Sequence, residues 1–319
     1  MQPERHVPVM PREVLEALNL RGEGLYVDGT LGEAGHSSLI LEKSAPGGRL
    51  LGLDRDSSSL ERARARLAAY GERVRLEHCG YEEIGDALET AGWEDGADGI
   101  LLDLGMSSAQ VDDAVRGFSF MTDGPLDMRM DTTAPPTAAD LVNHFSESEL
   151  VRILREFGEE RSARRIARKV VAERQKGEIR TTSELASLVE RAGVRGRPGH
   201  HPATRTFQAL RIAVNDELGR LARFLEDGWR WLRPGGRLVV ISYHSLEDRM
   251  VKRALRRWAA ECLCPPRRPL CDCGWSRKVR LVNRRLMTPT ADEVAANARA
   301  RSAGLRVVER LSALDNSHD

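Results

Sequence analysis

"VDGTLGEAGHSSLIL", residues Val27 to Leu41, carries the strongest indication of the fold. A short apolar run ends at Asp28, glycines follow at positions 29, 32 and 35, and a helical pattern then begins. A glycine-rich turn between a strand and a helix is typical of ligand-binding sites in α/β proteins. No lysine follows the glycines, which excludes a P-loop, and the spacing G-x-x-G-x-x-G differs from the G-x-G-x-x-G of dinucleotide folds.

The rest of the chain fits an α/β fold with a helical insertion. Short apolar runs alternate with helical patterns around the glycine turn, which favours βαβ units and a parallel sheet. The expected strands are "GLYVDGT", "GRLLGLDRD", "RVRLEHC", "DGILLDLG", the run after "RPGG" and "GLRVVERL". Three helices that open on Ser or Thr near a Glu interrupt this rhythm. We therefore expect residues 1–112 and 214–319 to form one discontinuous α/β domain around a helical insertion at 113–213.

Acidic residues end three of the expected strands: Asp28, Asp54 and Asp103. Ligands of open α/β sheets bind at the carboxyl ends of the strands. An acid there would repel a pyrophosphate but attract the ammonium and sulfonium of S-adenosyl-L-methionine. Asp54 is also placed to accept hydrogen bonds from ribose hydroxyls, a feature that NAD enzymes share. The alternative is that each acid only caps the helix that follows it. Together the three acids favour a site for a cationic nucleoside.

Composition limits the protein class. The 49 basic and 48 acidic residues leave a net charge of +1, which neither supports nor excludes a nucleic-acid partner. The first residues contain no apolar leader, and no apolar run is long enough to span a membrane. The clustered cysteines do not resemble the disulfide framework of a small secreted domain. We expect a soluble, cytoplasmic protein in a reducing compartment, without a membrane partner.

Four segments resemble the bacterial 16S rRNA (cytosine-N4)-methyltransferases and together span nearly the whole chain. They are "DLGMSSAQVDDAVRGFSFMTDGPLDMRMD" (103–131), "HPATRTFQALRIAVNDEL" (201–218), "RPGGRLVVISYHSLEDRMVKR" (233–253) and "NARARSAGLRVVER" (297–310). The resemblance implies a Rossmann-like class I methyltransferase sheet with an inserted helical domain. It also implies methyl transfer from S-adenosyl-L-methionine to the N4 amine of a cytidine in the decoding centre of 16S rRNA, within the small ribosomal subunit.

The resemblance further implies a set of cofactor contacts. By position these are Ala34, Gly35, His36, Asp54, Tyr81, Asp103 and Gln110. Two of them depart from the family pattern, since Ala34 replaces a common glycine and Tyr81 replaces a frequent Phe. Alanine fits the turn only if its φ stays negative, and the tyrosine ring can still lie against the adenine. His36 is expected to contact the cofactor and not to act as a base.

The chemistry requires mainly alignment, because the methyl group on a sulfonium is already activated. Many amino-methyltransferases place an Asp/Asn-Pro-Pro-aromatic turn after the fourth strand, but here the turn reads "DLGM". Asp103 is the one catalytic candidate: it can accept from the amine or only hold the cofactor, and we favour the second role. The sequence identifies no general base.

Six residues are candidates for substrate binding: Asp127, Arg129, His201, Arg205, His244 and Ser245. Asp127 and Arg129 lie in "GPLDMRM", which indicates a site-facing loop or, alternatively, a structural ion pair. His244 and Ser245 follow a strand and are placed to bond the base, although Ser245 is as well suited to cap the next helix. His201 and Arg205 belong to the basic run "RGRPGHHPATRTFQALR".

Local charge indicates where RNA binds. Arg and Lys outnumber acidic residues in 152–180, 191–211 and 249–285, which suits phosphate binding. Phe207 can stack on a base or pack inward, and the basic helix in the first region can also be an ordinary solvated face. We expect the target base to be splayed out into a cleft between insertion and sheet. The rival functions are a small-molecule methyltransferase and a non-catalytic RNA-binding assembly factor. The chain is a monomer or a homodimer.

A cysteine cluster, "CLCPPRRPLCDCG", holds Cys262, Cys264, Cys271 and Cys273 in two C-x-C pairs. Four thiolates can hold a structural zinc, although C-x-C is tighter than the usual C-x₂₋₄-C. Unpaired surface thiols and reversible disulfides are the alternatives. The fifth cysteine, Cys79, follows an expected strand and is predicted to be a core residue.

Overall fold

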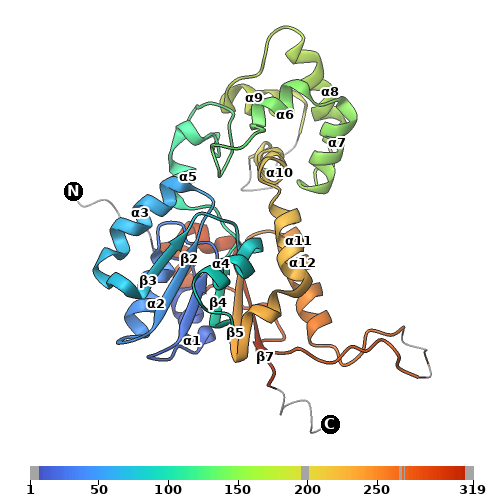
Figure 1. Ribbon diagram of the computed structural model, residues 1–319. Helices are drawn as coiled ribbons and strands as arrows, with labels where there is room; N and C mark the ends of the chain where they lie inside the picture. Colours follow the sequence, from blue (N-terminus) through green and yellow to red (C-terminus); the bar gives the residue numbers. More distant parts are fainter. Residues whose placement is uncertain (1–6, 195–200, 266–267, 269, 313–319) are drawn as a thin grey trace. The chain divides into compact units, whose positions relative to one another are not determined.

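The computed structural model describes residues 7–194, 201–265, 268 and 270–312. The chain divides into two compact units, shown in Figure 1. Unit 1 comprises Met1–Gly105 and Gly219–Asp319, and unit 2 comprises Met106–Leu218. The boundaries expected at 112/113 and 213/214 differ from these by a few residues at each crossing.

Unit 1 is built on a seven-stranded sheet with the order β3-β2-β1-β4-β5-β7-β6. The strands are β1 (Leu25–Asp28), β2 (Arg49–Leu53), β3 (Val74–Glu77), β4 (Ala97–Asp103), β5 (Leu232–Ser242), β6 (Val279–Leu281) and β7 (Gly304–Arg310). β1 to β5 pair in parallel, whereas β7 runs antiparallel to both β5 and β6. The α/β fold predicted from the sequence is confirmed, with β6 as an additional short strand.

Helices cover both faces of this sheet because its strands are apolar on both sides. On one face Val27, Leu102 and Val240 pack with α4 (Ile84–Thr90), α11 (Glu217–Asp227) and α12 (Ser245–Trp258). On the other, alternate strand residues such as Tyr26 and Leu101 pack with α1 (Pro11–Leu18), α2 (Gly35–Lys43) and α3 (Ser57–Leu67). Side chains two residues apart share a face, so the near-continuous apolar runs are those of a sheet buried on both sides. A short helix, α13 (Ala291–Ala296), precedes β7.

Unit 2 is helical and has its own apolar core. Its helices are α5 (Ser108–Asp112), α6 (Ala138–His144), α7 (Glu147–Glu156), α8 (Ala163–Arg174), α9 (Thr182–Arg191) and α10 (Thr204–Asn215). Ser146 and Thr181 form the expected capping boxes on α7 and α9. The expectation was wrong for α8, whose N-cap Ser162 makes no side-chain capping bond. Among the described residues, no helix combines the length and apolar character needed to cross a membrane.

Candidate functional site at the carboxyl ends of the strands

Asp28 ends β1 and ties the glycine loop to the first turn of α2. Its two carboxylate oxygens accept from the Thr30 N–H at 3.2 Å and the Ser37 hydroxyl at 2.6 Å. The side chain is only 2% exposed. Burial raises the pKa of Asp28, and the hydrogen bond from Ser37 partly opposes that rise. Asp28 therefore orders the loop from inside.

Asp54 follows β2 and holds the same loop from the neighbouring strand. Its oxygens accept from the Gly32 N–H and the Asp56 N–H, each at 2.8 Å. A carboxylate oxygen can accept more than one hydrogen bond, so acceptor capacity remains at each oxygen. Burial raises the pKa of Asp54 to about 6, against the opposing effect of these backbone bonds. Asp54 is thus ionised at neutral pH.

Asp103 ends β4 within a polar cluster drawn from four segments. Its N–H donates to the Thr30 hydroxyl at 2.6 Å, and one carboxylate oxygen accepts from the Tyr243 hydroxyl at 2.8 Å. Burial and the adjacent carboxylate raise the pKa of Tyr243, which keeps this phenol protonated as a donor. A Cβ at Gly105 would lie 2.7 Å from the Tyr243 ring, so the glycine of "DLGM" makes room for it.

His36 supplies an unsatisfied buried nitrogen to this cluster. The side chain is 7% exposed, and its Nε2 lies 3.7 Å from the second carboxylate oxygen of Asp103. Within the described part of the chain, this nitrogen has no hydrogen-bond partner. A buried polar atom left unpaired costs about 1–3 kcal/mol, so such atoms in native proteins call for an explanation such as a ligand or water.

The backbone conformation at Ala34 corrects a sequence expectation. Its φ is 58° and its ψ is 33°, so the alanine is left-handed and the expected negative φ was wrong. The turn requires this conformation because Gly32, at φ 51°, and Ala34 reverse the chain before α2 begins at Gly35. The Ala34 methyl is fully buried in the core of unit 1. At Gly29 a close approach requires glycine, since a Cβ would lie 2.5 Å from the side chain of Leu102.

The two remaining expected cofactor residues, Tyr81 and Gln110, have different surroundings. Tyr81 is partly buried, and its ring meets Phe224 edge-on at a centroid distance of 5.9 Å. Gln110 belongs to unit 2, where its side-chain oxygen accepts from the Ser107 N–H at 3.1 Å and completes the capping box of α5. The structure thus brings the glycine loop, Asp54 and Asp103 together within unit 1.

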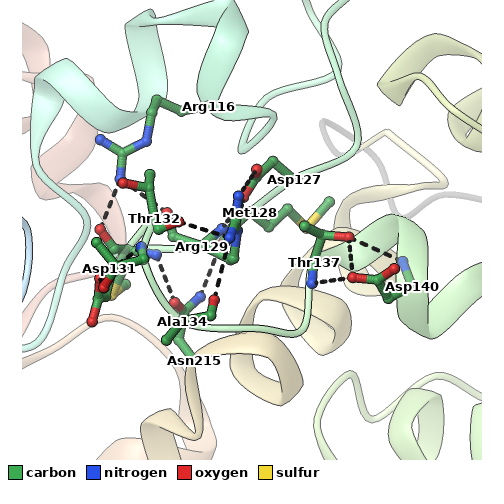
Figure 2. A network of polar contacts seen from close by, with 12 residues as sticks. Arg116, Asp127, Met128, Arg129, Asp131, Thr132, Ala134, Thr137, Asp140 and Asn215 are labelled. Carbon is green, nitrogen blue, oxygen red and sulfur yellow. Dashed lines mark hydrogen bonds and ion pairs between the residues drawn. The ribbon is translucent and has the colours of Figure 1, made fainter.

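Asp127 and Arg129 bond to each other within a network in unit 2 (Figure 2). Arg129 donates to both Asp127 oxygens at 2.8 and 2.7 Å, and also to the Thr132 carbonyl at 2.7 Å. Burial alone would raise the pKa of Asp127, but the bonds and charge of Arg129 outweigh it, so that pKa is lowered. Asn215 fixes the same segment by donating to the Met128 carbonyl and accepting from the Met130 N–H.

His201 lies three residues before α10, and Arg205 is the second residue of this helix. The His201 ring packs on Phe120 at a centroid distance of 4.6 Å, and its Nε2 lies 2.9 Å from a carboxylate oxygen of Glu190. Arg205 donates to the Glu159 carbonyl at 2.9 Å. Phe207 is buried in the core of unit 2, which settles its orientation inward. The rest of the expected basic run, residues 195–200, lies outside the described residues.

His244 and Ser245 follow β5, but the helix cap falls on His244. His244 is the N-cap of α12, and its Nδ1 accepts from the Glu247 N–H at 3.4 Å. Glu247, 3% exposed, accepts in return from the N–H groups of Tyr243 and His244. Ser245 is the first residue of the helix, so the capping role considered for it belongs to its neighbour.

Sequence reasoning missed four residues that order these sites: Thr30, Ser37 and Tyr243 in unit 1, and Asn215 in unit 2. Thr30 lies inside the glycine loop, so its position was a local signal that went unused. Tyr243 bonds across 140 residues of chain and carried no local signal.

The four clustered cysteines, a separate candidate metal centre, bring their sulfurs within 4.8 Å of one another. Cys79 packs against the core of unit 1, and burial raises the pKa of its thiol to about 12.

Comparison with known proteins gives a consistent result. The model of the MraW methylase family matches residues 3–311. A ribosomal RNA small subunit methyltransferase H of Geobacter sulfurreducens is 56% identical over 308 residues, which covers 96% of this chain and 99% of that protein. Proteins of the same name from Desulfovibrio desulfuricans and Symbiobacterium thermophilum are 53% and 50% identical, over 98% and 97% of this chain and 96% and 97% of their own lengths.

Proposed function

The chain belongs to the MraW methylase family, and we propose that it transfers a methyl group from S-adenosyl-L-methionine to the N4 amine of a cytidine in 16S rRNA. The observation that carries this proposal is the match over nearly the whole chain to proteins named for methylation of small-subunit ribosomal RNA. The acidic strand ends of unit 1 support it, because they suit a cationic nucleoside.

The residues of unit 1 fit the cofactor. The unpaired Nε2 of His36 offers a polar partner, and the remaining acceptor capacity of Asp54 suits ribose hydroxyls. We propose that the backbone of Ala34 and Gly35, together with Tyr81 and Gln110, completes the set. When bound, S-adenosyl-L-methionine supplies a methyl group already activated by its sulfonium.

The chain's own contribution is positioning and charge. Thr30 accepts from the backbone N–H of Asp103, and the Tyr243 hydroxyl donates to its carboxylate and so orients that carboxylate. Preorganised charge is worth more than mobile charge, because no reorganisation is needed during the reaction. We propose that this carboxylate holds the sulfonium cation of the cofactor, and we assign no general base.

The candidates for substrate binding divide by their surroundings. Asp127 and Arg129 satisfy each other, which favours a role in ordering their loop over direct contact with RNA. His244 and Ser245 follow β5 at the same sheet edge as Asp103, and we propose that they contact the target base or its neighbours. His201 and Arg205 remain proposed contacts of the RNA chain.

Ribosomal RNA is the substrate class, and α8 is the element of unit 2 best suited to its phosphates. Arg164, Arg165 and Arg168 are all exposed on this helix. Exposed guanidinium groups neutralise phosphates and release counterions. We further propose that the natural substrate is the small ribosomal subunit, which places the protein in the cytoplasm where bacterial subunits assemble.

Methyl transfer to the proposed substrate can be measured directly. Small subunits that lack the modification are incubated with the protein and labelled S-adenosyl-L-methionine, and the RNA is digested to nucleosides. Label in N4-methylcytidine supports the proposal. Tight cofactor binding without transfer to subunits or free 16S rRNA would instead indicate an assembly factor. Label only in small molecules would indicate the other rival function.

A further inference from the structure

The four clustered cysteines lie on a long connection between two elements of unit 1. This connection, here called the cysteine segment, comprises residues 259–278 and joins α12 to β6. Its described residues form no helix or strand, and those drawn in orange in Figure 1 extend away from the other elements of unit 1. Leu270 is 81% exposed. Ordering a residue costs about 1–2 kcal/mol, and so exposed a segment buries little apolar surface in return.

The base of the cysteine segment is closed by ordinary protein contacts. The Lys278 N–H donates to the Trp258 carbonyl at 2.9 Å, and the Trp275 indole donates to the Ala260 carbonyl at 3.0 Å. Trp275 also packs against the core of unit 1. These contacts hold the two ends of the segment together, and farther along it, near the cysteines, Arg268 forms an exposed ion pair with Asp272.

The four sulfurs converge on one point. The Sγ of Cys271 lies 3.3 Å from that of Cys262, 3.8 Å from that of Cys264 and 3.5 Å from that of Cys273. The Sγ atoms of Cys262 and Cys273 are 3.7 Å apart. A disulfide would bring two sulfurs to about 2.05 Å. In a tetrahedral site with Zn–S distances of about 2.3 Å, neighbouring sulfurs lie about 3.8 Å apart. The observed distances are close to that value.

The tight C-x-C spacing supplies hydrogen bonds to the sulfurs. The Cys264 N–H points at the Cys262 sulfur at 3.2 Å, and the Leu263 N–H points at the Cys273 sulfur at 3.5 Å. Hydrogen bonds to ligand atoms orient them and tune a metal site. The unusual spacing, which argued against zinc in the sequence, is therefore compatible with four sulfurs sharing one centre.

We propose that the cysteine segment binds one Zn²⁺ through four thiolates and that this metal fixes its two C-x-C pairs to each other. The ligands are Cys262, Cys264, Cys271 and Cys273. Four thiolates this close would repel one another strongly without a cation, and four protein sulfurs leave no open position for substrate. The site is therefore structural, and it does not depend on the proposed methyl transfer.

Metal content tests the proposal. The full chain is purified without added metal or chelator, and its metals are measured by mass spectrometry. We expect one zinc per chain, and a loss of at least nine-tenths of it in Cys271→Ser and Cys273→Ser. Two controls keep the zinc: Asp272→Asn lies between these cysteines, and Cys79→Ala removes the cysteine outside the cluster. Cys271 and Cys273 are exposed, so the serine variants leave the core intact.

Alkylation of the thiols provides an independent readout. We expect the four thiols to be protected until a strong chelator is added, and the segment then to become sensitive to protease while the cores stay folded. The proposal would be overturned by only a trace of zinc in the wild type, by equal zinc in the serine variants, or by a mass showing disulfides. A four-thiolate site accepts iron as well as zinc. Stoichiometric iron in place of zinc would therefore overturn the proposal that the metal is Zn²⁺.

Discussion

Tyr243 acts on the site through Asp103, and Tyr243→Phe isolates that effect. The change removes the hydroxyl that donates to Asp103 and keeps the ring that packs on Gly105. A hydrogen bond to a charged group contributes about 1.5–3 kcal/mol, which corresponds to roughly tenfold or more in affinity. We expect the Kd for S-adenosyl-L-methionine, measured by calorimetry, to rise about tenfold.

The product S-adenosylhomocysteine and a second tyrosine provide the controls. The product lacks the sulfonium charge, so its Kd should rise less in Tyr243→Phe if Asp103 holds that cation. Tyr26→Phe removes another buried hydroxyl, one that bonds the Arg21 backbone, and should leave both Kd values unchanged. If turnover fell in Tyr243→Phe while both affinities stayed intact, Asp103 would instead be assigned to the amine of the substrate.

Asp54 predicts a pH dependence of cofactor binding. Its pKa of about 6 in the fold lies above that of an unfolded aspartate, so its contribution to stability is present in acid and lost as pH rises through about 6. The affinity for the cofactor should change with pH in the opposite direction and rise as pH rises. Accepting hydrogen bonds from the ribose hydroxyls requires the ionised carboxylate. We expect affinity to fall several-fold as pH drops from about 7 to about 5.

The variant Asp54→Asn identifies the group responsible for that profile. It cannot ionise, so its Kd should be weak and change little between about pH 5 and about pH 7. Calorimetry or fluorescence titration at each pH measures both proteins. A variant as pH-dependent as the wild type would assign the profile to another group, with Asp28, also buried and raised in pKa, as the next candidate.

For individual site residues, the sequence predicts their position at the sheet edge better than it predicts their hydrogen-bond partners. Asp28 and Asp103 end apolar runs, and Asp54 directly follows one, so their placement at the sheet edge followed from local pattern alone. The donor to Asp103 did not, because Tyr243 reaches it only after β5 pairs with β4. The left-handed Ala34 was mispredicted because alanine favours negative φ, and the tertiary turn overrides that preference.

The turn into α2 depends on the left-handed conformation of Ala34, which a substitution can test. Ala34→Val places a β-branched residue in a left-handed conformation and adds volume to a fully buried position. Overpacking alone costs about 1–3 kcal/mol, and the backbone strain adds to it. We expect a loss of at least about 2 kcal/mol in the free energy of unfolding by urea.

Ala34→Gly is the matched comparison. It relieves the left-handed strain of about 1–2 kcal/mol, but it loses a buried methyl worth about 0.8 kcal/mol and adds unfolded-state entropy. The net change should stay within about 1 kcal/mol in either direction. A valine variant as stable as the glycine variant would contradict the left-handed conformation of this turn.

The segment that carries Asp127 and Arg129 depends on Asn215. Asn215 is 3% exposed and bonds the backbone of Met128 and Met130 from α10. Asn215→Ala leaves these two backbone groups without that partner, at about 1–3 kcal/mol each. We expect the free energy of unfolding to fall by about 3 kcal/mol and amide hydrogen exchange to rise in residues 124–140. Gln175→Ala, an exposed amide in the same unit, should change it by less than about 0.5 kcal/mol. Equal effects would show that Asn215 does not clamp the segment.

Element prediction succeeded where a periodic pattern was long enough. The strands that build the centre of the sheet were all expected, whereas β6, three residues long, was not. Periodicity needs several residues to emerge, and β6 forms only because β7 offers an antiparallel partner. The cap expected on α8 failed because a serine before a helix does not by itself secure a side-chain bond.

For the whole molecule, strand order was beyond local pattern. The alternation of strands and helices predicted a parallel sheet, but not that β7 lies antiparallel between β5 and β6. The resemblance to known methyltransferases implied the Rossmann-like sheet and the insertion, while the pairing itself comes from contacts distant in sequence. The substrate follows from neither the sheet nor its order, since many functions share one fold.

RNA binding by the whole protein should depend on how its charges are distributed. The net charge of +1 neither supports nor excludes binding to RNA, so the prediction rests on local clusters of arginines such as those of α8. Each phosphate neutralised on a single strand adds about −0.7 to the slope of log K against log salt. The double variant Arg164→Gln/Arg168→Gln should therefore make that slope shallower by about 1.4 and weaken binding at low salt.

Filter binding to 16S rRNA over a salt series measures the slope. The matched control, Arg12→Gln/Arg64→Gln, removes two exposed charges from α1 and α3 of unit 1 and should leave the slope unchanged. If the α8 variant kept the wild-type slope, its arginines would form an ordinary solvated face. If both variants changed it equally, attraction would follow total charge and not the helix. Only a change of slope confined to the α8 variant supports phosphate binding by this helix. The slope depends on the number of local phosphate contacts that release counterions and not on the net charge of the chain.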